Sequence, residues 1–266
     1  MSARVRLGLQ DRFAPGANVR ERFERARRYG FDAIELSVDT IASAREAARE
    51  RIPVSALCGG YRGWLIDPDG ESRRHAAEDL SQLVDIAGEL GCGCVVVPIW
   101  GRTRNLPNIG TGRTRDEDEA IFVEAMRELA ARAERAGARL FIEPLNRYQN
   151  DLCQTIGEAL RLRDRIGSKA VLVMGDAFHM NIEEPDMGAA LRAAGAALGH
   201  VHLADNDRRE PGTGHLALGP IFDALAAISY DGYASFELAS LSGPADEVLP
   251  RSVEHVRGLI AAAAGR

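Results

Sequence analysis

Lysine is almost absent from this chain of 266 residues. Lys169 is its one lysine, so subtracting 1 from the 33 basic residues leaves 32 arginines. Schiff-base catalysis and pyridoxal-phosphate attachment require a lysine, as does a phosphate-binding loop of the G-x-x-x-x-G-K-[ST] type. Lys169 follows a predicted helix in Gly-Ser-Lys-Ala, where a solvated turn is expected rather than the buried cleft that perturbs a catalytic amine. Lysine-based chemistry is therefore excluded.

Cysteine and long apolar runs are also scarce. The chain has four cysteines, and the Cys-Gly-Cys spacing at Cys92 and Cys94 is neither a redox C-x-x-C motif nor a zinc knuckle. No run reaches the ~18 apolar residues of a membrane span, and the first residues contain no signal-peptide core. We therefore expect a protein of the reducing cytoplasm that has no contact with a membrane.

Positive charge is in deficit, because 39 acidic residues give the chain a net charge of −6. Nucleic-acid binding needs a basic face to neutralise phosphates, so no nucleic-acid partner is expected. The hydrophobic content of 45% is that of a globular protein with a sizeable core. At this length we expect one domain spanning residues 1–266. The sequence leaves the oligomeric state open and is compatible with a homo-oligomer.

Short apolar runs alternate with longer amphipathic segments along the whole chain. The predicted strands are Val5–Leu9, Ala33–Leu36, Val54–Cys58, Cys94–Pro98, Arg139–Glu143, Val171–Asp176, His200–Leu203 and Ala234–Glu237. The predicted helices are Val19–Tyr29, Thr40–Arg51, Ser72–Leu90 (with Ser72 as N-cap), Thr114–Ala136, Thr155–Ile166, Asp186–Ala197, Pro220–Ile228 and Glu247–Ala263. Eight such units predict the α/β class and a single (β/α)8 TIM barrel. An open doubly wound sheet is the alternative fold. It is less favoured, because the G-x-G-x-x-G motif that usually follows its first strand is missing.

Ionisable residues stand at the ends of four consecutive predicted strands. They are Glu143, Asp176, His202 and Glu237. In a barrel these ends meet at the carboxyl-terminal mouth, where chemistry collects. Three carboxylates and one imidazole suit Mn²⁺, Mg²⁺ or Co²⁺ better than a thiolate site would. We therefore expect a divalent-metal site at the mouth.

Further candidates surround these four residues. His179 and Arg208 follow two of the strands and are expected to contact substrate, and Tyr61 and Trp100 lie in loops at the mouth, where aromatic rings bind sugars. Arg102, Arg104, Arg113 and Arg115 are a solvated charged cluster or, alternatively, a clamp for an acid group. The loop Glu210–His215 is glycine-rich, and a plain turn is favoured there over a phosphate site. His200 is expected to face away from the shell around His202 or, alternatively, to be a spare polar group.

At these residues the chain resembles the sugar phosphate isomerase/epimerase family, whose barrels are similar to xylose isomerase. The matching strings are Ile142–Tyr148, Gly175–Glu184 and His200–Asn206, with Pro211–His215 and Cys58–Gly63 beside them. Within that family the ketose 3-epimerases resemble it most.

The resemblance implies roles for individual residues. Metal ligands would be Glu143, Asp176, His202 and Glu237, with Mn²⁺ or Co²⁺ the usual ion. Glu143 and Glu237 would be the catalytic acid and base, and His179 and Arg208 would contact substrate. One departure is Gln149, which stands where those epimerases carry a glutamate. A neutral amide there can neither accept a proton nor repel an anion.

The chemistry expected from this site is proton abstraction next to a carbonyl through a metal-bound enediolate, which epimerises or isomerises a ketose or a keto-sugar acid. A lyase is the nearest alternative, either an inosose dehydratase or a deglycosylating eliminase, because the same intermediate can expel a group. A DNA-repair endonuclease would need more ligands than six histidines supply, and a basic groove. A non-catalytic sugar-binding barrel is the remaining class.

Overall fold

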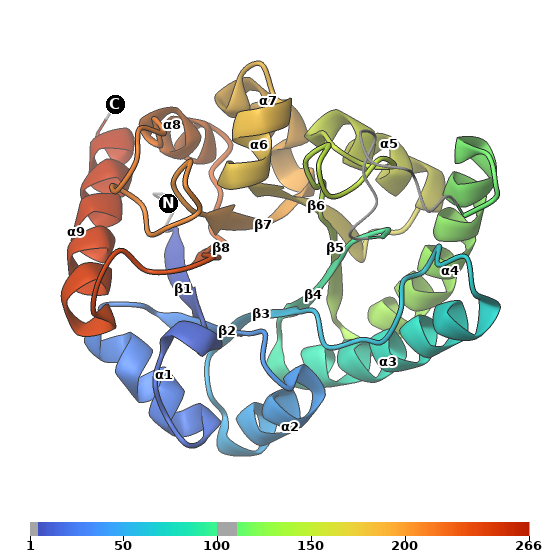
Figure 1. The fold of residues 1–266 in the computed structure, drawn as a ribbon, viewed down its shortest axis with the longest axis horizontal. Helices are drawn as coiled ribbons and strands as arrows, with labels where there is room; N and C mark the ends of the chain where they lie inside the picture. Colours follow the sequence, from blue (N-terminus) through green and yellow to red (C-terminus); the bar gives the residue numbers. More distant parts are fainter. Residues whose placement is uncertain (1–4, 100–110, 266) are drawn as a thin grey trace.

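Eight parallel strands close into a barrel in the computed structural model, which describes residues 5–99 and 111–265 (Figure 1). Each strand pairs with its neighbours in chain order, and β1 closes the barrel on β8. The strands are β1 Arg6–Gln10, β2 Ala33–Leu36, β3 Val54–Cys58, β4 Gly93–Val96, β5 Arg139–Ile142, β6 Val171–Asp176, β7 Leu198–Leu203 and β8 Tyr233–Phe236. The predicted barrel is confirmed.

Helices surround the barrel and cover its outer surface (Figure 1). In the described ranges they are α1 Val19–Arg28, α2 Thr40–Glu50, α3 Gly70–Leu90, α4 Arg115–Ala136, α5 Ile156–Ile166, α6 Ala177–Glu183, α7 Met187–Ala194, α8 Gly219–Ala227 and α9 Ala245–Ala264, with 3-10 turns at Asp11–Phe13 and Gly195–Ala197. None of these helices has both the length and the apolar stretch that crossing a bilayer requires. Helix α6, inside the β6–α7 connection, was not predicted.

Side-chain caps set where the helices begin. Thr114 and Thr155 each form a capping box with the glutamate three residues later. In each box the threonine side chain accepts from the backbone N–H of the glutamate, and the glutamate side chain accepts from that of the threonine. The prediction of Ser72 as an N-cap is wrong, because the Asp69 carboxylate accepts from the Ser72 N–H and helix α3 begins at Gly70. The predicted helix Asp186–Ala197 is also too long, since the backbone changes to a 3-10 turn at Gly195.

The apolar core has two parts. The larger part lies between the sheet and the helices, and the smaller one consists of Ala56, Val95, Phe141 and Met174. Phe141 and Met174 each precede a strand-end acid by two residues, so alternation along the strand places them one layer below it. Gly199 makes room for this layer, because a Cβ there would come within 2.6 Å of the Phe141 ring. The polar site at the mouth therefore rests on a filled apolar floor.

Candidate metal and active site

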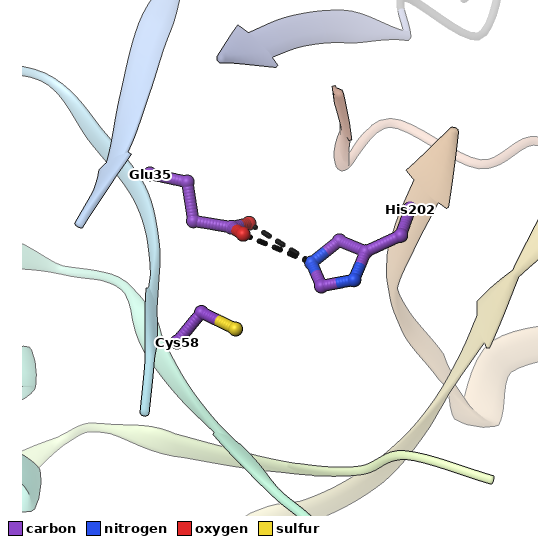
Figure 2. Close-up of side chains that lie close together, drawn as sticks. All are labelled: Glu35, Cys58 and His202. Atoms are coloured by element: carbon purple, nitrogen blue, oxygen red, sulfur yellow. Dashed lines mark hydrogen bonds and ion pairs between the residues drawn. The ribbon is translucent and has the colours of Figure 1, made fainter. Parts of the chain in front are cut away.

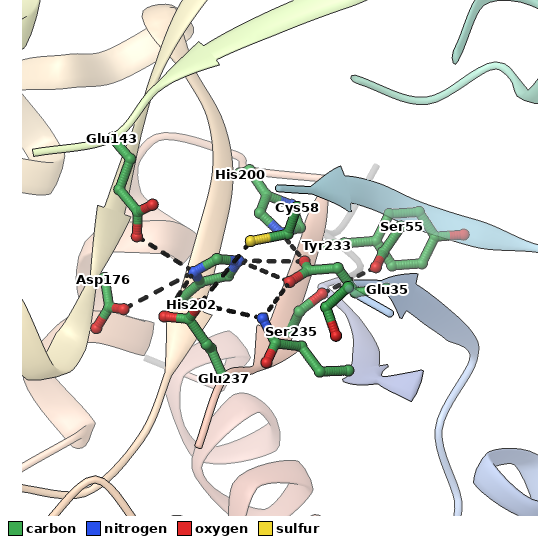
Figure 3. A network of polar contacts seen from close by, with 12 residues as sticks. Glu35, Ser55, Cys58, Glu143, Asp176, His200, His202, Tyr233, Ser235 and Glu237 are labelled. Carbon is green, nitrogen blue, oxygen red and sulfur yellow. Dashed lines mark hydrogen bonds and ion pairs between the residues drawn. The ribbon is translucent and has the colours of Figure 1, made fainter. Parts of the chain in front are cut away.

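The barrel brings the four strand-end residues predicted as ligands together. Glu143 follows β5, Asp176 ends β6, His202 lies in β7 and Glu237 follows β8. One ligand atom from each lies within 4.8 Å of the other three (Figure 3). Because the four strands are adjacent in the closed sheet, the cluster occupies one side of the mouth.

The Nδ1 atom of His202 lies at the centre of this cluster. It is 3.4 Å from Glu143 Oε1, 3.7 Å from Asp176 Oδ2 and 3.4 Å from Glu237 Oε2. Glu143 Oε1, Asp176 Oδ2 and His202 Nδ1 are all buried, and none has a hydrogen-bond partner among the described residues. Buried polar atoms normally have partners. These three atoms converge on one point together with Glu237 Oε2, which accepts a hydrogen bond from Arg208. Three carboxylates and one imidazole fit a divalent cation of the Mn²⁺, Mg²⁺ or Co²⁺ kind.

The protonation of the cluster reflects this crowding of charge. Burial, reinforced by the charge of Glu237, raises the pKa of Glu143 to about 7. Burial would lower the pKa of His202, but the surrounding carboxylates, Glu35 and Glu237 foremost, raise it well above its ordinary value. Burial would likewise raise the pKa of Glu237, but His202 and Arg208 hold it well below its usual range. Without a cation, protons on Glu143 and His202 therefore carry part of the compensating charge.

Helix α6 orients Asp176. The aspartate is the N-cap of this helix, and its Oδ1 accepts hydrogen bonds from the Phe178 N–H at 2.7 Å and the His179 N–H at 3.3 Å. With Oδ1 fixed in this way, Oδ2 is left facing the cluster. Helix α6, which was not predicted from the sequence, thus determines the orientation of Asp176.

His179 lies in helix α6 rather than in a loop, and its ring is buried beside Asp176. Its Nδ1 accepts from the Asn146 backbone N–H at 3.3 Å and lies 2.7 Å from Asn146 Nδ2. A backbone N–H can only donate, so the proton of the neutral ring is on Nε2. Burial lowers the pKa of His179, which keeps the ring neutral. The Nε2 atom has no hydrogen-bond partner and lies 3.8 Å from Asp176 Oδ2, so it is a free donor at the site.

Arg208 lies against Glu237. Its guanidinium donates to Glu237 Oε2 at 2.9 Å and stacks over the Phe178 ring at 4.8 Å. The backbone of Arg208 is left-handed, with φ of 58°, and Ala239 donates its N–H to the Arg208 carbonyl. These contacts direct the side chain back over the mouth, where its fork can bind a substrate oxygen.

The other predicted contacts divide into three groups. The Tyr61 hydroxyl accepts from the Val97 N–H at 3.3 Å, which ties the loop after β3 to the end of β4. Arg113 pairs with Asp118 at 2.8 Å and Arg115 with Glu158 at 2.8 Å, so both guanidinium groups have partners within the chain. The remaining predictions in this region, Trp100, Arg102 and Arg104, lie outside the described residues.

The glycine-rich loop after β7 is closed by a carboxylate of the same chain. Asp205 accepts hydrogen bonds from the N–H groups of Asn206, Gly212 and Leu216. These amides would otherwise be free for an anion, and their hydrogen bonds lower the pKa of Asp205 against the effect of its burial. The favoured interpretation of this loop as a plain turn agrees with these contacts.

Three buried polar residues of the site were not recognised from the sequence: Gln10, Glu35 and His200. Glu35 faces His202 from β2 and accepts a hydrogen bond from its Nε2 atom (Figure 2). The expectation that His200 faces away is wrong, because His200 and His202 are two residues apart in β7 and side chains alternate in a strand. The His200 ring lies 5.1 Å from that of His202 and bonds to the same Glu35. A glutamate inside the apolar run Ala33–Leu36 was the available signal for this contact.

Comparison with known proteins finds sugar epimerases of similar sequence. The chain is 35% identical over 240 residues to the 3-dehydro-D-guloside 4-epimerase of Escherichia coli, an alignment that covers 88% of this chain and 92% of the relative. It is 35% identical over 247 residues to the D-psicose 3-epimerase of Enterocloster bolteae, covering 85% of this chain and 79% of the relative.

Among solved structures, the 3-keto-D-glucoside 4-epimerase of E. coli in its apo form superposes with a TM-score of 0.88 at 33% identity. The superposition covers 96% of this chain and 100% of that structure. The model of the xylose isomerase-like TIM barrel family matches residues 23–259. The family resemblance seen in the sequence motifs is thereby confirmed, and the chain belongs to the xylose isomerase-like TIM barrel family.

Proposed function

We propose that this protein is a metal-dependent sugar epimerase, which inverts a carbon next to the carbonyl of a ketose or keto-sugar. The observation that carries the proposal is the set of buried lone pairs on Glu143, Asp176 and His202 that converge without partners. The named relatives are sugar epimerases, which supports the same reaction class. We further propose that residues 1–266 act as one domain. We also propose a location in the cytoplasm, because four free cysteines are typical of a reducing compartment.

Glu143, Asp176, Glu237 and His202 through Nδ1 would hold the ion, with Mn²⁺ or Co²⁺ our first choice and Mg²⁺ the alternative. A divalent cation bound there would act as a Lewis acid, which polarises the carbonyl and stabilises the negative charge that develops when the neighbouring proton leaves.

The proton transfers are assigned to Glu143 and Glu237, which reach the cluster from β5 and β8. One carboxylate removes the proton from the carbon, and the other returns a proton to the opposite face, so that mass and charge are conserved. The configuration of the substrate decides which glutamate acts first. The Arg208 guanidinium, 2.9 Å from Glu237 Oε2, would keep that carboxylate ionised and ready to accept a proton.

Substrate orientation is assigned to two hydrogen-bond donors around the cluster, one neutral and one charged. The free Nε2–H of His179 and the fork of Arg208 would bind sugar oxygens, and Tyr61 and Trp100 would line the mouth. Arg113 and Arg115 have partners within the chain and are not assigned to the substrate. Because the arginines of this cluster that the structure describes are engaged within the chain, we favour a neutral ketose or keto-glycoside over a keto-sugar acid.

The test is a panel of ketoses, keto-glycosides and keto acids followed by NMR in deuterated water with Mn²⁺ present. We expect deuterium at one carbon next to the carbonyl and a product of inverted configuration, with no atoms lost apart from the exchanged hydrogen. Loss of water or of an aglycone would make the enzyme a lyase. Absence of exchange across the panel would leave a sugar-binding barrel and overturn the proposal.

A further inference from the structure

Glu35 is a fully buried carboxylate beneath the proposed metal site. Its side chain has no exposed surface, and it projects from β2 on the opposite side of the barrel from the ligand strands β5 and β6. His202 Nε2 lies 3.0 Å from Glu35 Oε1 and 3.1 Å from Oε2 (Figure 2). His202, one ligand of the proposed site, therefore has a buried charged partner. The roles proposed so far for the site residues do not account for Glu35.

The contact decides which nitrogen of His202 is available to a metal. An ionised carboxylate can only accept hydrogen bonds, so the Nε2 atom that faces it carries a proton. In the neutral ring the lone pair is then on Nδ1, the atom that faces Glu143, Asp176 and Glu237. Glu35 thereby fixes both the tautomer and the direction of the ring.

Glu35 also reaches a second ligand through Gln10, the last residue of β1. The Gln10 Nε2 amide donates to Glu35 Oε1 and to Glu237 Oε1, each at 3.1 Å. Both neighbours are carboxylates, so the amide nitrogen must face them. With Glu237 Oε1 engaged in this way, Glu237 Oε2 is the oxygen that faces His202 Nδ1 at 3.4 Å.

Glu35 is itself fixed from below by His200. His200 Nε2 lies 2.7 Å from Glu35 Oε2, and its ring stacks on Phe141 with 5.5 Å between centroids and 10° between planes. The contacts among Glu35, His200, His202 and Glu237 can be followed in Figure 3. A carboxylate held by partners from two other strands, β1 and β7, has a defined position from which to orient ligands.

We propose that Glu35 is a positioning residue for the metal site, which orients His202 directly and Glu237 through Gln10. It binds no metal itself, and its contribution is affinity and geometry at the ion. The proposal rests on the proposed function in one respect, because it requires the four-residue cluster to hold a divalent cation.

The first test is the affinity of Glu35→Gln for Mn²⁺ alone, measured by calorimetry, together with the visible absorption spectrum of bound Co²⁺. Removing a partner of this kind weakens metal binding by about 10- to 100-fold, and we expect that range together with a shifted Co²⁺ spectrum. The matched control is Glu119→Gln, which makes the same change at another buried glutamate, on helix α4, and should leave both readouts unchanged. A general loss of packing would affect both variants alike, so a change in Glu35→Gln alone points to the metal site.

A second variant covers the case in which Glu35→Gln does not fold. Gln10→Met keeps the length of the side chain and removes the two hydrogen bonds to Glu35 and Glu237, so we expect Mn²⁺ affinity to fall by about 10-fold. Affinity within twofold of wild type in whichever of the two variants folds overturns the proposal. If the wild-type chain itself binds no Mn²⁺, or if Asp176→Ala binds it as well as wild type, the proposed function fails first. Wild-type binding that Asp176→Ala abolishes and Glu35→Gln preserves overturns the positioning role alone.

Discussion

Buried carboxylates occur in two parts of this barrel, and their charge is compensated differently. On helix α4, the buried Glu119 carboxylate bonds to Arg161 and Arg165 and lies 3.5 Å from Arg115. The bond from Arg161 lowers the pKa of Glu119 against the effect of burial. This glutamate therefore has three arginines within ion-pair distance.

At the mouth, acidic groups outnumber their cationic partners. Glu35, Glu143, Asp176 and Glu237 share three histidines, His179, His200 and His202, and in the described part of the chain Arg208 is the arginine within ion-pair distance of them. Burial lowers the pKa of His179 and of His200, so His202 and Arg208 are the cationic partners. Two of the ligand carboxylates keep a buried oxygen without a hydrogen bond. This chain has 32 arginines and one lysine, so cationic side chains are plentiful overall. Their shortage at the mouth supports our proposal that a metal cation binds there.

Metal removal gives the largest expected difference between the two regions. Dialysis against a chelator should abolish epimerisation and Mn²⁺ should restore it, because the mouth loses its compensating charge. The Glu119 cluster has its own arginines and should be unaffected. Activity that is indifferent to the chelator would remove the metal from this account.

Replacing one carboxylate of the proton-transfer pair comes next. Glu143→Gln or Glu237→Gln should lower kcat by about 10²- to 10⁴-fold, the range for losing a general acid or base. The measurement is turnover with saturating Mn²⁺, and Glu119→Gln is the control that should retain the wild-type rate. Full activity in either variant at the mouth would refute the assignment of the pair.

Metal affinity should depend on pH at the mouth. The pKa of Glu143, raised to about 7 by burial, means that a proton occupies this ligand below that pH in the metal-free protein. Metal and protons then compete at Glu143 and at His202, so Mn²⁺ affinity should fall as the pH decreases, and below 7 the Glu143 proton should add about a tenfold fall per pH unit. Calorimetry between pH 5.5 and 8, values about 1.5 units below and 1 unit above that pKa, gives the slope. Constant affinity across that window would contradict the raised pKa of Glu143.

The smallest expected effect is on the free energy of unfolding. Replacing a buried glutamate by glutamine should change it in opposite directions in the two regions. Glu119→Gln removes a charge paired with half-exposed arginines and should lower the free energy of unfolding by about 1–2 kcal/mol. An acid whose folded pKa is raised destabilises the fold above that pKa, so metal-free Glu143→Gln should be more stable than wild type at pH 8 by on the order of 1 kcal/mol. Denaturant titration of both metal-free variants measures this, and shifts of the same sign would remove the contrast.

The fold and the clustering of the four strand-end residues could be predicted from the sequence for a clear physical reason. Parallel strands of a barrel expose their carboxyl ends at one mouth, so strand-end residues such as Glu143 and Asp176 meet whatever the loops do. Glu35 and Gln10 were not found, because single polar residues inside apolar strands do not reveal which distant strand they will face. The orientation of Asp176 depends on helix α6, a seven-residue element too short to give a clear helical period.

Anomalous scattering from a crystal grown with Mn²⁺ tests the central claim most directly. The account predicts one strong peak bound by carboxylate oxygens of Glu143, Asp176 and Glu237 and by Nδ1 of His202, at about 2.0–2.3 Å. A second group of close ligand atoms, on Glu35, Cys58 and His202, offers the alternative position (Figure 2). A peak there, bound by His202 Nε2, or no peak at either place, would contradict the account.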